Sequence, residues 1–107
     1  MENESESDDF YLTEKKELYF LRLFVTGASP NSARAIANIK NICEQNLGNS
    51  YELEIIDVYQ QPLIAENEQI VALPLLIKKF PLPERRLIGD LSDTEKVLRG
   101  LGLLASE

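Results

Sequence analysis

Residues 18–58 read LYFLRLFVTGASPNSARAIANIKNICEQNLGNSYELEIIDV, and the pattern of apolar residues here predicts the first half of the fold. Its first eight residues are almost entirely apolar, which is typical of a central strand covered on both faces. Ser29 and Pro30 supply a helix cap and a first helical residue, and Gly48 ends a run of apolar residues at helical spacing. Residues 51–58 alternate and then become apolar, which predicts a second strand. Strand, helix and strand in this order predict two parallel strands joined by a right-handed crossover.

The remaining sequence predicts a shorter helix, a hairpin and a last helix. Residues 62–72 carry a small apolar set that predicts the helix. Residues 75–77 form a short apolar run, the turn-forming FPLPE follows, and residues 85–88 predict the second strand of a hairpin. Ser92 and Glu95 form an S-x-x-E pattern, which predicts a capping box at the start of the last helix. The expected order is βαβαββα, an α/β arrangement of the thioredoxin-like type.

Composition removes several classes of function. The chain has 107 residues, no histidine, one cysteine and a net charge of -7. Histidine-dependent catalysis and histidine zinc sites are therefore excluded, and Cys43 alone forms neither an intrachain disulfide nor a CxxC pair. The acidic charge argues against nucleic acid, and no apolar run is long enough to span a membrane. We expect one domain in the cytoplasm, with no metal and no cofactor.

The acidic charge is concentrated at the N-terminus. Residues 1–17 contain seven acidic residues and two lysines. They show no apolar periodicity, which predicts a solvated, disordered arm before a single domain at residues 18–107. A specific acidic docking peptide is the alternative for this arm.

The turn between the first strand and the first helix argues against thiol chemistry. It reads Ser29-Pro30-Asn31-Ser32, whereas a thioredoxin-type enzyme needs a thiolate at this helix N-terminus. Ser29 and Asn31 suit helix capping, with anion binding at the exposed amides as the alternative. Cys43 lies on the apolar stripe of the helix, where we expect it to be buried and inert. Pro74 begins a strand at the position of the thioredoxin-like cis proline, and we expect a structural role for it.

Four longer strings resemble one family. They are LFVTGASPNS at 23–32, IIDV at 55–58, QPLIAENEQIVALP at 61–74 and PLPERRLIGDLSDTEKVL at 81–98. Together they are similar to the KaiB family of bacterial circadian clock proteins, over residues 18–104. The resemblance implies a noncatalytic protein, in a clock or a stress response, that binds a KaiC-like hexameric ATPase and changes its phosphorylation and ATPase cycle. It also implies a KaiA-like protein or a SasA-like histidine kinase as further partners.

The same resemblance implies two folds for one chain. In this family a βαββααβ ground state, assembled as a homodimer or homotetramer, exchanges with the binding-competent βαβαββα form. The resemblance assigns the balance between them to Gly89, Asp90, Gly100 and Gly102. Gly100 and Gly102 also weaken the last helix if they lie in its interior. A frayed terminal helix is the alternative explanation for these two glycines.

Positive charges mark the candidate binding residues. Lys78, Lys79, Arg85 and Arg86 place four cations within nine positions of an acidic chain, which favours an acidic partner surface. Solvated strand ends are the alternative for these four residues. The resemblance implies partner-binding roles for Arg34, Arg85 and Arg86, and for the position of Gln69.

Three functions are consistent with these patterns. The first is a KaiB-like binding protein that regulates a KaiC-type ATPase. The second is a thioredoxin-like scaffold or stress-response protein without such a partner. The third is a monothiol thioredoxin-like oxidoreductase that uses Cys43, which the SPNS turn argues against.

Overall fold

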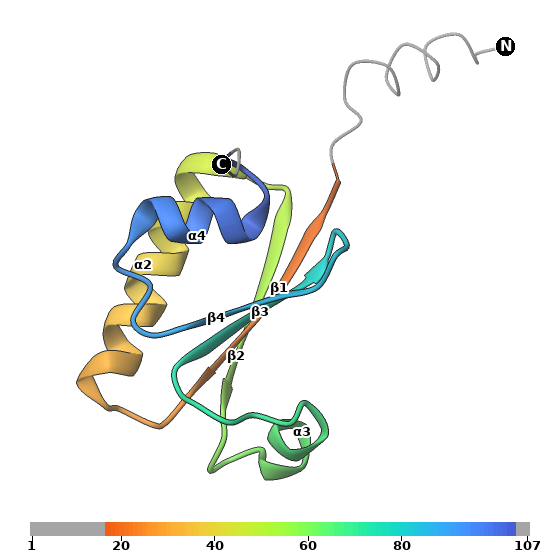
Figure 1. Ribbon diagram of the computed structural model, residues 1–107. Helices are drawn as coiled ribbons and strands as arrows, with labels where there is room; N and C mark the ends of the chain where they lie inside the picture. Colours follow the sequence, from red (N-terminus) through yellow and green to blue (C-terminus); the bar gives the residue numbers. More distant parts are fainter. Residues whose placement is uncertain (1–16, 105–107) are drawn as a thin grey trace, which may run out of the picture.

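A computed structural model describes residues 17–104 (Figure 1). Within these residues, seven elements follow one another in the predicted βαβαββα order. They are β1 (Tyr19–Val25), α2 (Pro30–Asn46), β2 (Tyr51–Asp57), α3 (Pro62–Asn67), β3 (Leu75–Phe80), β4 (Arg85–Ile88) and α4 (Thr94–Leu101). Of the predicted acidic arm at residues 1–17, only Glu17 belongs to the described residues.

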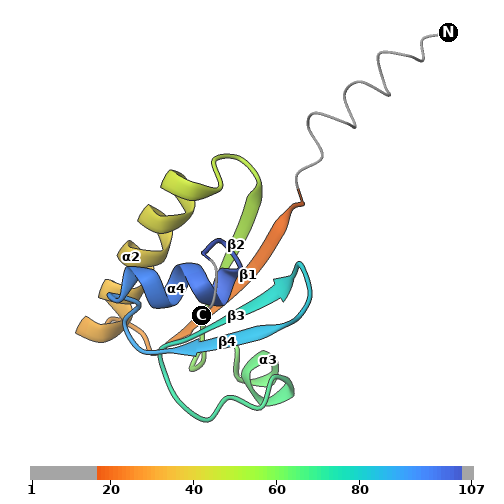
Figure 2. The ribbon, with the colours of Figure 1, turned by 45° about the horizontal axis from the view of Figure 1, so that its top comes forward.

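The strands form one mixed sheet in the order β2-β1-β3-β4. β1 and β2 are parallel, with Tyr19 opposite Tyr51, so the parallel pairing predicted for the first half is confirmed. β3 runs antiparallel to both β1 and β4, and Lys78 lies opposite Arg85 in the β3–β4 pair. Helices α2 and α4 cover one face of the sheet and α3 covers the other (Figures 1 and 2).

Each face of the sheet has its own apolar core. Under α2 and α4, Leu21 and Leu23 of β1 pack against residues of both helices, including Ile39 and Leu101. Under α3, the buried side chains are Phe24, Ile56, Leu75 and Ile77. β1 contributes to both cores because successive strand residues point to opposite faces. This explains why residues 18–25 are apolar almost throughout, apart from Arg22.

The start of α2 is built as its sequence predicts. Ser29 is the N-cap residue, and its hydroxyl accepts a hydrogen bond from the Ser32 amide at 3.1 Å. The buried Ser32 hydroxyl in turn accepts from the Thr26 amide at 3.0 Å, which fixes the end of β1 to the first turn of the helix. At the other end Gly48 has φ +58, a left-handed conformation that glycine adopts at no steric cost.

The prediction for α3 was too long. The helix ends at Asn67 and not at Ala72, and Gln69 has φ +57, which is incompatible with a continuing helix. The chain turns here because the guanidinium of Arg86 on β4 donates hydrogen bonds to the carbonyls of Glu68, at 2.7 Å, and Gln69, at 3.4 Å. Val71 is consequently 88% exposed and does not belong to an apolar helix face.

The predicted capping box at the start of α4 was also wrong. Asp93 is the N-cap residue, and its carboxylate accepts from the Lys96 amide at 3.2 Å. The Ser92 amide instead donates to the Asp90 carboxylate at 3.1 Å, in the turn before the helix. Gly102 is the C-cap residue at φ +80, so the predicted cost of a glycine in the helix interior does not apply to it.

Gly100 does lie within α4, and it faces β4. A Cβ atom at this position would be 2.8 Å from Leu87 Cδ1 and 2.9 Å from Leu87 Cδ2. The absence of a side chain therefore lets α4 lie close against Leu87.

In the part of the chain that the structure describes, no helix has both the length and the apolar character needed to cross a bilayer.

Candidate functional site

A shallow groove lies where β1 meets α2. Its lining residues are Thr26, Ser29, Pro30, Asn31, Arg34, Leu73 and Pro74. The Leu73–Pro74 peptide bond is cis, and the Pro74 carbonyl accepts a hydrogen bond from the Gly89 amide at 3.0 Å. Hydroxyl, amide and guanidinium groups line this groove, and no thiol does.

Cys43 lies away from the groove. It is fully buried in the core between α2 and the sheet. Burial, with a smaller effect from the neighbouring Glu44 carboxylate, raises the pKa of the Cys43 thiol to about 12. The thiolate form that attacks disulfides is therefore scarce at neutral pH, and the expectation of a buried cysteine is confirmed.

Arg34 and Asp90 meet at one end of the groove. The Arg34 Nε atom lies 3.3 Å from Asp90 Oδ2, and the Asn38 amide donates to the Asp90 carbonyl at 2.8 Å. Arg34 also donates to the side chain of Asn31. Hydrogen bonds from the hydroxyl and amide of Ser92, together with Arg34, lower the pKa of Asp90. Helix α2 thus fixes the turn that follows β4.

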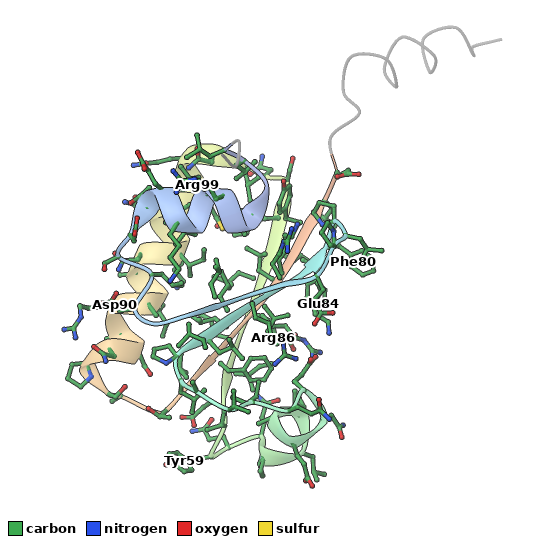
Figure 3. The ribbon with its side chains drawn as sticks, in the orientation of Figure 1. Tyr59, Phe80, Glu84, Arg86, Asp90 and Arg99 are labelled. Atoms are coloured by element: carbon green, nitrogen blue, oxygen red, sulfur yellow. The ribbon has the colours of Figure 1, made fainter. Side chains whose placement is uncertain are left out.

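A second polar group of residues lies on the α3 face of the sheet, and we call it the Glu68 cluster. Its members are Glu68, Arg22, Lys79, Arg86, Glu54 and Glu84. Glu68 is central, because its carboxylate lies 3.1 Å from Arg22 Nη1, 3.0 Å from Lys79 Nζ and 3.5 Å from Arg86 Nη2. Figure 3 shows Arg86 and Glu84 on the side of the sheet that faces α3.

The Glu68 cluster connects the segment after α3 to three strands. Arg22 lies on β1, Lys79 on β3 and Arg86 on β4. Partial burial alone would raise the pKa of Glu68, but the hydrogen bond and charge of Lys79 and the charges of both arginines outweigh it and lower the pKa. The ionised carboxylate is therefore the form that holds these elements together.

The outer carboxylates contribute less to this cluster. Among residues 17–104, Glu54 forms an ion pair with Arg22 alone, at 2.9 Å, and its side chain is 43% exposed. Glu84 lies 3.6 Å from Lys79 and 4.0 Å from Arg86, and its side chain is 41% exposed. Solvent-exposed pairs of this kind add little stability.

The two adjacent arginines of β4 point to opposite faces of the sheet. Arg86 contacts the carbonyls of Glu68 and Gln69 on the α3 face. Arg85 lies two positions before Leu87, which packs in the core under α2 and α4, so Arg85 shares that face. Arg85 is exposed, and no carboxylate of residues 17–104 lies within 4.0 Å of its guanidinium.

The predicted site residues lie in two groups, with Arg85 separate from both and Gly100 and Gly102 in α4 and at its end. Arg34, Pro74, Gly89 and Asp90 lie together around the groove. Gln69 and Arg86 lie together on the other face, where the Gln69 backbone makes the contact.

Four members of the Glu68 cluster were not predicted as site residues. They are Glu68, Arg22, Glu54 and Glu84. The one usable signal was Arg22, because a charged residue inside an otherwise apolar central strand needs a partner. Within residues 17–104, no set of three or more histidine, cysteine, aspartate or glutamate side chains could hold a metal ion.

The family model described as the KaiB domain matches residues 22–103 of this chain. The chain belongs to the KaiB family. It is 55% identical over 84 residues to the circadian clock protein KaiB3 of Synechocystis sp., which covers 78% of this chain and 82% of that relative. It is 51% identical over 92 residues to the circadian clock oscillator protein KaiB of Synechococcus elongatus. That alignment covers 86% of this chain and 90% of the relative.

Solved structures place this KaiB-family chain among thioredoxin-like folds. The N-terminal domain of Synechococcus elongatus SasA superposes with a TM-score of 0.66 at 27% identity, covering 86% of this chain and 90% of that domain. Mitochondrial thioredoxin 3 of Saccharomyces cerevisiae superposes with a TM-score of 0.66 at 14% identity, covering 92% of this chain and 90% of the thioredoxin. This is a likeness of fold alone. The predicted thioredoxin-like fold is confirmed.

Proposed function

We propose that this KaiB-family chain is a noncatalytic regulator that binds a KaiC-type hexameric ATPase and modulates its phosphorylation and ATPase cycle. One observation carries the proposal. At the groove where a thioredoxin-type enzyme needs a reactive thiol, this chain presents Ser29 and Asn31, while Cys43 is buried in the core. A thioredoxin-like scaffold without that thiol is suited to recognition, and the family relatives are named as clock proteins.

The proposed binding residues are Arg34, Gln69, Arg85 and Arg86. Exposed arginines favour an acidic partner surface, since they steer association and form hydrogen-bonded ion pairs. Arg85 has the simplest role, because no described carboxylate competes for it. Arg86 has a structural role as well, since its guanidinium holds the segment after α3 in place.

The proposal includes a change of fold in the second half of the chain. We assign this balance to Gly89, Asp90, Gly100 and Gly102, with a βαββααβ homodimer or homotetramer as the other state. In support, Gly89 has φ +115 and the next residues include Leu91 at φ +63, a backbone region that L-residues rarely adopt. The contact of Gly100 with Leu87 exists only while α4 packs on β4.

Further partners belong to the same proposal. The similarity to the SasA N-terminal domain supports competition between two proteins of one fold for the same surface of the ring. A KaiA-like protein and a SasA-like kinase are therefore proposed as members of the same assembly, in the cytoplasm.

Size-exclusion chromatography with a KaiC-type ATPase tests this function. The chain is expected to elute with the ring in at least one nucleotide state and to show no insulin reduction. Capture of an unrelated protein, with no co-elution under ATP or ADP, would favour the scaffold alternative. Insulin reduction that disappears in Cys43→Ala would favour the oxidoreductase.

A further inference from the structure

Lys78 on β3 is a buried cation in an unfavourable setting. The residue is only 5% exposed, and it lies on the α2 and α4 face of the sheet, two positions after Leu76. No atom of residues 17–104 accepts a hydrogen bond from its ammonium group, and no carboxylate among them lies within 4.0 Å of it. Burial of a charge without a partner is costly.

The residue opposite Lys78 increases that cost. The β3–β4 register places Lys78 directly across from Arg85, and like charges in this position repel each other. Burial and the charge of Arg85 lower the pKa of Lys78, and Glu17 opposes them. Glu17 is the residue at which the acidic N-terminal segment joins the domain.

Exposed apolar side chains lie at the same end of the sheet as this pair of cations. Leu18 is 55% exposed, Phe80 54% and Leu82 72%. Phe20 of β1 lies opposite Phe80, so the start of β1 and the β3–β4 turn lie at the same end of the sheet (Figures 1 to 3). This end of the sheet therefore carries two cations, Lys78 and Arg85, and three exposed apolar side chains, Leu18, Phe80 and Leu82, and we call these five residues the patch.

The segment that precedes this patch has the complementary composition. Residues 1–16 contain six acidic residues and two lysines, and Asp8 and Asp9 stand immediately before Phe10, Tyr11 and Leu12. Phe10 is eight residues before Leu18, so an extended chain reaches at most about 29 Å from the start of the domain. That reach covers the end of the sheet on which the patch lies.

We propose that the acidic N-terminal arm, residues 1–16, docks in cis on the patch around Lys78 and Arg85. Its carboxylates supply the partners that these cations lack among the described residues, and its aromatic residues cover Phe80 and Leu82. A docked arm would compete with a partner protein for Arg85. This competition rests on the proposed function, whereas the docking does not depend on it.

Paramagnetic relaxation on the full chain tests the docking. A nitroxide is attached to Ser7→Cys at neutral pH, where the buried Cys43 does not react. At low ionic strength we expect the amide signals of Lys78, Phe80, Leu82 and Arg85 to lose intensity while those of α2 keep theirs. The loss should fade in about 1 M salt, where the screening length is about 3 Å.

Two variants and one mixing experiment complete the test. Arg85→Glu, which reverses the charge of an exposed side chain, should abolish the intensity loss. Lys40→Glu, on the exposed side of α2, should preserve it. A mixture of nitroxide-labelled chains without ¹⁵N and ¹⁵N-labelled chains without nitroxide should show no loss. The proposal would be overturned if the broadening were uniform or absent, or if the intensity loss survived Arg85→Glu. Intensity loss in the mixed sample would also overturn it, because the arm would then bind a second copy of the chain.

Discussion

Replacing Glu68 by glutamine removes the negative charge that three cations share while it keeps the size of the side chain. The Glu68 side chain is 13% exposed, and its partners Arg22, Lys79 and Arg86 are 24%, 25% and 37% exposed. Breaking a fully buried pair costs about 3–5 kcal/mol and losing an exposed pair about 0–1, so this partly buried cluster predicts a loss of about 2 kcal/mol. For a domain of this size that corresponds to a fall in Tm of about 8–16 °C.

The effect of Glu68→Gln on stability should depend on pH. Because folding lowers the pKa of Glu68, the carboxylate stabilises the fold above its unfolded pKa of about 4.3, and this contribution is lost as the pH falls through the lower folded value. The difference in stability between the wild type and Glu68→Gln should therefore be largest near neutral pH. It should shrink in acid.

Urea unfolding at low ionic strength, at neutral pH and near pH 3, measures both effects. Glu84→Gln is the matched control, because Glu84 contacts Lys79 and Arg86 at 3.6 and 4.0 Å but its side chain is 41% exposed. The control should change stability by no more than about 0.5 kcal/mol. Equal losses for the two variants at neutral pH, or a loss for Glu68→Gln that does not depend on pH, would refute the role given to Glu68.

Three further predictions concern the helices. Gly100→Ala should not give the gain of about 1 kcal/mol in urea unfolding that helix propensity alone predicts, because the new Cβ would lie 2.8 Å from Leu87 Cδ1 and the Leu87 side chain must move; the full gain of about 1 kcal/mol would contradict this packing. Cys43 should not react with Ellman's reagent near pH 8 until urea unfolds the chain, and rapid reaction of the native chain would count against its burial. Asp93→Ala should cost about 1 kcal/mol in thermal unfolding and Ser92→Ala less; the reverse ranking would restore the capping box.

The first half of the fold was predictable because its signals are local. The apolar strand, the cap at Ser29 and the terminating Gly48 each act within a few residues of the element they define. The parallel pairing of β1 and β2 then follows from the helix between them, because a strand–helix–strand unit usually joins parallel strands.

The errors in the second half have long-range causes. α3 ends early because Arg86, 18 residues beyond Glu68, takes the carbonyl of that residue, and no local signal indicates this contact. The cap of α4 lies at Asp93 because Arg34 and Asn38 hold Asp90, which in turn binds the Ser92 amide. Two neighbouring residues could each cap this helix, and contacts with α2 decide between them.

The four cations of residues 78–86 were predictable from the sequence, but their carboxylate partners and their arrangement were not. The sequence analysis identified the four cations at residues 78–86, but neither an acidic partner surface nor solvated strand ends accounts for all four. Lys79 and Arg86 are paired with Glu68, Lys78 is buried, and Arg85 alone among the four is solvent-facing without a described carboxylate partner. Strand alternation separates the neighbours, and the pairing of β3 with β4 brings Lys78 and Arg85 together.

The most direct test of surface recognition is a titration of the ¹⁵N-labelled chain with a KaiC-type hexamer, under ATP and under ADP, followed by its amide spectrum. We predict nucleotide-dependent changes at the amides of Arg34, Gln69 and Arg85, and weaker binding by Arg85→Ala without loss of its thermal stability. A spectrum unchanged in both nucleotide states would contradict it, as would changes confined to residues around Cys43.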